Sequence, residues 1–415
     1  MGQAIGVVFP AAVLLVLRDG EILFHRAYGH LDPETRRRPT RMDSLFDLAS
    51  LTKLFTATAF VRLVEAGAVT LETPVSAVLP EFGGVHPVVP SINPLSGELI
   101  SPDPRWAQAI VDADKITFWH LLTHTSGLAA WRPLYRMGYR MGKSDGPVPF
   151  PWQVTPATRA RRVAAISDGR SFAYPTGEGL VYSDLGLILL GEAVAKLAGE
   201  RDRTRIERIG RKEPDFFSGN LENGAGDLLD GAIRRLVMER LGLKRACFNP
   251  LAHGVPADEI APTEFCSWRR RRCLGEVHDE NAAGLGGVAG HAGLFAAAEE
   301  VAALGAVYLN GGESDGRRLL SPTTVAEMTR EQMRMNGLSL GLGWQRKSAD
   351  GGPVCRVCSE NSYGHTGFTG TSLWVDPDRR LVVALLTNRV YGGRDPRGIA
   401  AFRPALHGAI VDALT

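Results

Sequence analysis

Two stretches of strand-like residues at opposite ends of the chain constrain its fold more than any other feature. Near the N-terminus, the apolar stretches 15–17 and 22–24 flank a polar turn at 18–21. Near the C-terminus, residues 372–375 and 381–386 flank the turn residues Asp-Pro-Asp. Each pattern predicts a β-hairpin. We therefore expect one antiparallel sheet to draw strands from both termini, followed by a final amphipathic helix at about residues 399–414.

The long stretch between the hairpins is mostly helical in pattern and is broken by loops. With 415 residues, 44% of them hydrophobic, the chain is long enough for two lobes with cores of their own. We expect an α/β lobe from residues 1–75 and 290–415, and a mostly helical lobe inserted at 76–289. The polar stretch 201–226 is interpreted as an insertion with little core.

Composition excludes several classes of partner. The net charge is +2, and the short basic runs are not interleaved with aromatic residues, so we expect no nucleic-acid binding. The apolar stretch 5–17 is too short to span a membrane and has no basic residue before it, unlike a secretory leader. The sequence as it stands predicts a cytoplasmic protein, or a periplasmic or extracellular one if a leader has been removed.

The five cysteines are an odd number in a large chain, which argues against a disulfide framework. Cys355 and Cys358 form a C-x-x-C pair with no second pair to complete a zinc site. We expect ordinary reduced thiols here rather than a zinc or redox site.

Ser50 and Lys53 are the first candidates for chemistry. A helical pattern runs from Ser50 to Ala66, and residues three apart share one face of a helix. Ser50 would lie at the N-terminus of this helix, where free backbone N–H groups favour developing negative charge. A serine needs a base before it attacks a carbonyl, and a neutral lysine one turn away can supply it. An N-capping serine beside an exposed lysine is the structural alternative.

Two further motifs lie far away in the sequence. Tyr182 precedes Ser183, Asp184 and an apolar helix, and its phenol can relay protons to a leaving group. His365 precedes Thr366 and Gly367, whose small side chains would let a substrate lie beside a strand. The backbone N–H groups of Ser50 and Phe368 could together form an oxyanion hole. Each motif also has a structural reading, as a half-buried tyrosine and as a glycine-containing strand start.

Taken together, Ser-x-x-Lys, Tyr-Ser-Asp and His-Thr-Gly resemble, in this order, the signatures of class C β-lactamases and low-molecular-mass DD-peptidases. Residues 116–128 are similar to a helix and turn typical of that family. Residues 275–282 and 286–295 resemble a bacterial DD-carboxypeptidase-like subgroup. The resemblance implies a two-lobed α/β fold of the β-lactamase/transpeptidase type, with the site at the interface of the lobes.

The resemblance also implies roles for individual residues. Ser50 would be the nucleophile, Lys53 its base partner and Tyr182 the proton relay. The oxyanion hole would be formed by the N–H groups of Ser50 and Phe368. Substrate would be bound by Asp184, His365, Thr366 and Gly367. His291 is a possible border of the site.

Two departures from the family pattern bear on the substrate. Most β-lactamases have lysine where this chain has His365, and asparagine where it has Asp184. A histidine is only partly charged at neutral pH, so it is a weaker anchor for a substrate carboxylate. Histidine at this position resembles the DD-peptidases and esterases of the family. A carboxylate at Asp184 would favour a charged Lys53, and the proton among these groups cannot be assigned from sequence.

We therefore expect a serine hydrolase that acts through an acyl-enzyme on a small-molecule or peptide substrate, without metal or organic cofactor. D-Ala-ended peptides and small esters are the favoured substrates, and a covalent β-lactam adduct is possible. A class C-like β-lactamase and a non-catalytic binding or assembly protein are the alternatives. His278, Asp279 and His291 are also candidate metal ligands, but their spacing matches no familiar zinc site.

Overall fold

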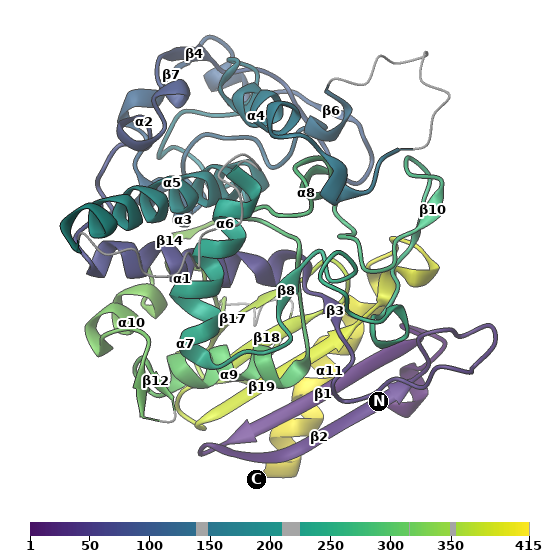
Figure 1. Cartoon of the computed structure of the whole chain (residues 1–415). Coiled ribbons are helices and arrows are strands. Elements are labelled where there is room, and N and C mark those ends of the chain that lie inside the picture. The colour runs from purple at the N-terminus through teal and green to yellow at the C-terminus, as the bar shows by residue number, and fades with distance from the viewer. Residues whose placement is uncertain (138–147, 210–224, 315, 349–353, 415) are drawn as a thin grey trace. The chain divides into compact units, whose positions relative to one another are not determined.

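The hairpins predicted at the two ends of the chain are both present. The computed structural model describes residues 1–137, 148–209, 225–314, 316–348 and 354–414. At the N-terminus, β1 (Ala11–Arg18) pairs with β2 (Glu21–Gly29), and at the C-terminus β18 (Ser372–Asp376) pairs with β19 (Leu381–Thr387). Strand β1 also pairs with β19, so the two ends form one antiparallel sheet, as predicted (Figure 1).

This main sheet has the strand order β14-β15-β16-β17-β18-β19-β1-β2. All neighbouring strands are antiparallel, and the register places Ala12 opposite Thr387 and Arg18 opposite Leu381. The strands not yet bounded are β14 (Met333–Met335), β15 (Leu338–Leu340), β16 (Gln345–Arg346) and β17 (Tyr363–Thr366).

Helices cover both faces of the sheet because its central strands are apolar on both sides. Leu385 packs in one buried cluster with Ile399 and Leu406 of the C-terminal helix α11 (Arg397–Leu414). On the opposite face, helix α9 (Ala298–Leu309) lies so close that a Cβ on its Gly305 would come within 2.7 Å of Val382 Cγ1. Alternate residues of one strand therefore face different helices, as a period of two requires.

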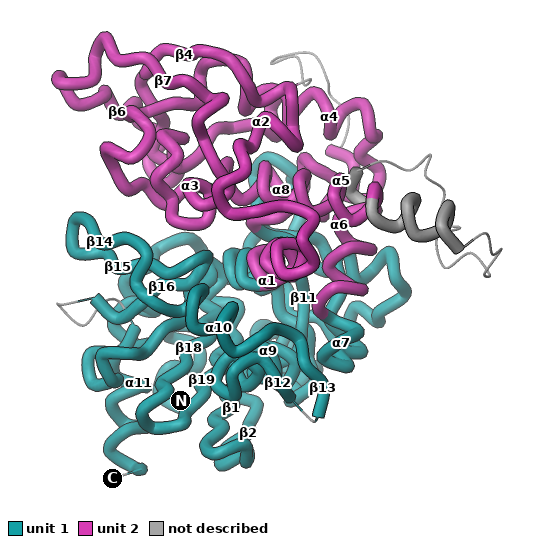
Figure 2. Tube along the Cα trace, turned by 90° about the vertical axis from the view of Figure 1, so that its left-hand side faces the viewer, with its two compact units in different colours: residues 1–54, 238–279, 292–415 teal, residues 55–237, 280–291 magenta. Residues whose placement is uncertain are grey.

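The chain divides into two compact units (Figure 2). The first comprises Met1–Leu54, Met238–Asp279 and Ala292–Thr415, and the second comprises Phe55–Val237 and Glu280–His291. The boundary falls inside helix α1 (Thr52–Glu65).

The first unit contains a second, smaller sheet that bears on the site. It consists of β3 (Phe46–Asp47), β11 (Leu294–Ala296) and β8 (Cys247–Phe248), in the order β3-β11-β8. Its presence explains why residues 238–279, which the sequence analysis placed in the helical lobe, belong to the first unit. The unit also contains α7 (Glu239–Leu241), β9 (Phe265–Cys266), β10 (Arg271–Arg272), β12 (Glu313–Ser314), β13 (Arg317–Arg318) and α10 (Pro322–Thr329).

The second unit is dominated by helices and irregular segments. Its helices are α2 (Val75–Val78), α3 (Phe118–Leu122), α4 (Pro156–Ala164), α5 (Asp184–Ile209), α6 (Ala225–Ile233) and α8 (Glu280–Gly284). Its short strands are β4 (Val85–Pro87), β5 (Ser91–Ile92), β6 (Leu99–Ile100) and β7 (Ile110–Asp112). The core of the proposed insertion at 201–226 lies outside the described residues, and 201–209 continue α5.

Two further expectations can be compared with the structure. Among the described helices, none is both long enough and apolar enough to cross a bilayer. The expectation of reduced thiols at the C-x-x-C pair is wrong, because Cys355 and Cys358 form a disulfide. Their Cα atoms lie 5.4 Å apart, a separation that disulfides commonly bridge and that the loop between β16 and β17 provides.

Candidate active site

Ser50 and Lys53 are joined by a hydrogen bond. Ser50 lies in a short 3-10 turn, Ala49–Leu51, directly before α1, so the regular helix begins two residues later than the sequence pattern predicts. The Lys53 Nζ donates to Ser50 Oγ at 2.8 Å. Lys53 is 1% exposed, although a lysine is almost never fully buried without a partner. The reading as a capping serine beside an exposed lysine is therefore wrong.

The backbone before Ser50 is held in an unusual conformation. Ala49 has a φ of 47°, in the left-handed region that costs a non-glycine residue about 1–3 kcal/mol. Its N–H donates to Asp47 Oδ1 at 2.8 Å, and the N–H of His278 donates to Asp47 Oδ2 at 2.6 Å. Burial raises the pKa of Asp47, although both hydrogen bonds act in the opposite direction. Asp47 thus fixes the turn that presents Ser50.

The turn after β17 lies directly against this segment. Thr371 Oγ1 donates to the carbonyl oxygen of Leu48 at 3.0 Å, and Thr369 Oγ1 donates to that of Asp47 at 2.7 Å. A Cβ on Gly367 would lie 2.6 Å from Leu48 O and 2.0 Å from Thr371 Oγ1, which only a glycine avoids. The His365-Thr366-Gly367 segment and Ser50 are therefore neighbours within the first unit.

The two predicted oxyanion-hole donors are the backbone N–H groups of Ser50 and Phe368. The N–H groups of Ser50 and Phe368 make no hydrogen bond to any residue that the structure describes. Phe368 is held by Arg389, whose Nε donates to its carbonyl oxygen at 2.9 Å and whose guanidinium lies 4.7 Å from its ring centroid. Its other ring neighbour is His278, at a centroid distance of 5.5 Å. Both N–H groups are free to bind a ligand oxygen.

The charge of His365 differs from the partial positive charge that the sequence analysis expects at neutral pH. Its side chain is buried, and its Nδ1 lies 2.9 Å from Thr366 O. Burial is the main cause that lowers the pKa of His365 to about 3. The imidazole is therefore uncharged at neutral pH and supplies no cation for a substrate carboxylate.

Arg403 is a residue of this region that the sequence analysis missed. It lies on α11, and its Nη2 donates to Gly367 O at 3.0 Å and to Thr371 O at 2.7 Å. Burial lowers the pKa of Arg403 to about 9. A signal did exist, because Arg403 falls on the same helical face as the buried residues Ile399 and Leu406. No sequence pattern could have pointed to Asp47, because it lies in a two-residue strand, which is too short to show a periodic pattern.

Tyr182 and Asp184 belong to the second unit, where they lie at the start of α5. The N–H of Ser183 donates to His124 Nδ1 at 3.0 Å, and the rings of His124 and Tyr182 lie 4.7 Å apart between centroids. The N–H of Val181 donates to His124 O at 3.1 Å. His124, which has a φ of 57°, therefore holds the segment just before α5. It lies within the family-like stretch 116–128 but was not singled out.

His278 and His291, the two other histidines singled out in the sequence, are both buried. His278 Nε2 lies 3.1 Å from Glu264 Oε1. Burial of Glu264 opposes ionisation, but His278 and Arg394 outweigh it and lower the pKa of Glu264 to about 2. His291 is buried in the second unit, after Gly290, whose Cβ would lie 2.1 Å from Leu187 O of α5. A role for His291 at the border of the site stays a prediction.

The chain is similar to known proteins over most of its length. A family model described as "Beta-lactamase" matches residues 6–405. An N-acetylmuramyl-L-alanine amidase of Bacillus subtilis (strain 168) is 32% identical, over 92% of this chain and 77% of that protein. A putative D-alanyl-D-alanine carboxypeptidase of Salmonella schwarzengrund (strain CVM19633) is 28% identical, over 92% of this chain and 79% of that protein.

Among solved structures, EstCE1, described as a hydrolase with promiscuous acyltransferase activity, has the same fold. It superposes with a TM-score of 0.64 at 22% identity, over 98% of this chain and 96% of that one. The predicted family resemblance and fold class are confirmed. The chain belongs to the β-lactamase family and is a serine hydrolase of that family.

Proposed function

We propose that the chain is a DD-carboxypeptidase- or esterase-type hydrolase in which Ser50 forms the acyl-enzyme. The observation that carries the proposal is the 2.8 Å hydrogen bond from Lys53 Nζ to Ser50 Oγ, beside the strand segment 365–367. A hydroxyl bonded to a buried amine, next to two open backbone N–H groups, has the parts that acyl transfer requires.

In the proposed reaction, Ser50 Oγ attacks the substrate carbonyl carbon while its proton passes to a neutral Lys53. The carbonyl oxygen becomes an oxyanion and accepts hydrogen bonds from the N–H groups of Ser50 and Phe368. When the tetrahedral intermediate collapses, the leaving amine or alcohol takes a proton through Lys53 and Tyr182. Water then attacks the carbonyl carbon of the acyl-enzyme and gives one proton to Lys53. The bond between the acyl group and Ser50 Oγ breaks, the acyl group leaves as a carboxylic acid with the hydroxyl of the water, and Lys53 returns the proton to Ser50. The role of Tyr182 rests on the family motif.

The substrate class follows from charge. A β-lactam carries a carboxylate that most β-lactamases bind with a lysine, whereas His365 is uncharged here because its pKa is lowered to about 3. Arg389 and Arg403 lie behind the turn, but they already donate to the carbonyl oxygens of Phe368, Gly367 and Thr371. A D-Ala-ended peptide also carries a terminal carboxylate, so the missing cation by itself favours small esters. We keep D-Ala-ended peptides beside them because the relatives are named as amide hydrolases. The names of the relatives, an N-acetylmuramyl-L-alanine amidase and a putative D-alanyl-D-alanine carboxypeptidase, agree with amide substrates.

The test begins with covalent labelling. Purified protein and Ser50→Ala are incubated with a fluorescent penicillin and with an activated ester, and intact mass and peptide mapping locate any adduct. We expect one adduct, on Ser50, and none in the variant. Absence of an adduct with both reagents would favour the alternative of a non-catalytic binding protein.

Turnover then separates the enzymatic options. Rates are compared on a D-Ala-D-Ala peptide, a p-nitrophenyl ester and nitrocefin. We expect turnover of the peptide or the ester and slow deacylation after nitrocefin. Nitrocefin turnover faster than both would reverse the preference and identify a β-lactamase. His365→Lys tests the charge argument directly, because it should raise the rate on nitrocefin if the missing cation limits it.

A further inference from the structure

A second cluster of reactive side chains lies in the first unit, at a place that the proposed hydrolase reaction does not use. The disulfide between Cys355 and Cys358 belongs to the loop before β17 and packs in a buried cluster with Val354 and Trp374. Both cysteines are buried, at 0% and 3% exposed. The pair is therefore part of the core rather than of the surface.

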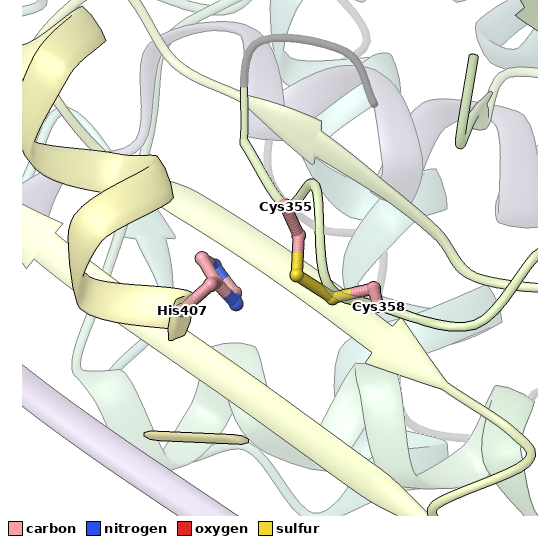
Figure 3. A group of neighbouring side chains, drawn as sticks. All are labelled: Cys355, Cys358 and His407. Atoms are coloured by element: carbon pink, nitrogen blue, oxygen red, sulfur yellow. A yellow bond between two sulfur atoms is a disulfide. The ribbon is translucent and has the colours of Figure 1, made fainter. Parts of the chain in front are cut away.

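His407 of α11 faces this pair. Its imidazole is 1% exposed and points toward the two sulfur atoms (Figure 3). One nitrogen of His407 and the two Sγ atoms all lie within 4.8 Å of one another. Two sulfurs at C-x-x-C spacing and one imidazole are the ligand types that Zn²⁺ prefers.

We propose that Cys355, Cys358 and His407 bind one Zn²⁺ ion when the disulfide is reduced. In a tetrahedral site with ordinary bond lengths, ligand atoms lie about 3.6–3.8 Å apart. Reduction lets the two sulfurs separate to this distance, and the imidazole is already near enough to complete the set. With three protein ligands, the fourth position is left for water or a small ligand.

The chemistry balances in two steps. A dithiol reduces the disulfide, supplying two electrons and two protons, and becomes a cyclic disulfide itself. Zn²⁺ then displaces one proton from each thiol and forms two Zn–S bonds and one Zn–N bond. Two thiolates and a neutral imidazole make the complete site electrically neutral. Neutrality matters because an unbalanced charge is costly among buried apolar side chains such as Trp374.

The chain provides an internal control. Cys266 and Cys273 are also buried and adjacent, since their thiols are hydrogen-bonded to each other. Arg269 Nη1 lies 3.0 Å from Cys273 Sγ, and among the described residues no His, Cys, Asp or Glu adds a third ligand atom within 4.8 Å of both thiols. These two thiols test whether any buried cysteine pair in this protein binds metal.

The experiment uses full-length protein reduced with dithiothreitol and exchanged anaerobically into thiol-free buffer. Co²⁺ is titrated in as a spectroscopic probe, followed by displacement with Zn²⁺. We expect one equivalent of Co²⁺, with the thiolate-to-cobalt charge-transfer band and the intense visible bands of a tetrahedral site. Oxidised protein should show neither band. Zn²⁺ should also raise the thermal midpoint of the reduced protein, because the preformed site in the folded state should bind it more tightly than the unfolded chain does.

Variants assign the ligands. Cys355→Ser and Cys358→Ser should each abolish stoichiometric binding, and the double variant Cys266→Ser/Cys273→Ser should retain it. His407→Gln should weaken binding by at least about tenfold, since even the outer-shell partners of a metal contribute that much. Loss of the bands in the Cys266/Cys273 variant, their persistence in Cys355→Ser, or unchanged affinity in His407→Gln would overturn the proposal. The proposal would also be overturned if the wild-type protein, reduced and folded, showed no such bands on addition of Co²⁺.

Discussion

Arg403 donates a hydrogen bond to the carbonyl oxygen of Gly367, 36 residues earlier, at 3.0 Å. The C-terminal helix is thereby bonded to the turn that lies beside Ser50. The same guanidinium nitrogen also donates to Thr371 O at 2.7 Å. The two ends of this turn, Gly367 and Thr371, are thus both bonded to the buried side chain of Arg403.

Replacing Arg403 by methionine should therefore destabilise the protein. The variant leaves two buried carbonyl oxygens without their charged donor, at a cost of about 3 kcal/mol. Chemical denaturation of the wild type and the variant measures the difference. Arg397→Met is the control, because Arg397 is an exposed residue of the same helix that forms an ion pair with the exposed Asp395. Equal midpoints for the two variants would contradict the assigned role.

Lys53→Met should slow acylation of Ser50 by about 10²–10⁴-fold, the usual contribution of a general base. The change removes the 2.8 Å hydrogen bond to Ser50 Oγ while preserving most of the buried side-chain volume. Acylation is followed by the rate of labelling with an activated ester in single-turnover conditions. Lys115→Met, at an exposed lysine on the second unit, should label at the wild-type rate. If both variants label equally fast, Lys53 is not the base.

Gly367→Ala should reduce activity because the added methyl group has no room. It would meet Thr371 Oγ1 at 2.0 Å and Leu48 O at 2.6 Å, so the turn must move. We expect a loss of stability of about 1–3 kcal/mol and a fall in rate of about 10²–10³ if the N–H of Phe368 is displaced. Gly392→Ala, where nothing lies within 4 Å, should change neither the thermal midpoint nor the rate. An active, stable Gly367→Ala enzyme would argue against a rigid turn.

Stability should fall in mild acid partly because of His365. Its pKa is lowered from 6.5 to about 3, so between these values the unfolded chain binds more protons than the folded one. The contribution of His365 to stability is thus fully present above pH 6.5. It decreases by up to about 1.4 kcal/mol for each pH unit below that value, until the pH approaches 3. Thermal midpoints measured from pH 7.5 to 5 should fall less steeply in His365→Gln than in the wild type. His253→Gln, at an exposed histidine, should follow the wild type, and parallel curves for all three proteins would contradict the buried, uncharged state.

The parts of the fold that were predictable are those with clear periodicity. The hairpins β1–β2 and β18–β19 and the helix α11 extend over many residues, so alternation and helical spacing identify them. The small sheet was not predictable, because two- or three-residue strands such as β3 and β8 have no period. Residues 238–279 join the first unit through that sheet, and through packing of Ile260 against Leu45 and Phe295.

Some features of the candidate site were likewise predictable from the sequence, and others were not. The pairing of Ser50 with Lys53 followed from helical spacing, and the proximity of Gly367 to the serine segment followed only from the family resemblance. Neither approach reveals Asp47, since its partners Ala49 and His278 are brought together by tertiary folding. The charge of His365 was also misjudged, because burial cannot be read from a motif. The Cys355–Cys358 disulfide was missed because an odd cysteine count says nothing about a local pair.

The pairing of β1 with β19 has a consequence for how the protein is made. Arg18 leaves the ribosome long before its partner Leu381, and at common translation speeds the delay is roughly 20–70 s. Throughout that time the nascent hairpin exposes an unpaired, apolar edge, which is a template for wrong association. Successful synthesis therefore depends on shielding that edge until the last strand emerges, and slowing elongation should increase the fraction of newly made chains that aggregate.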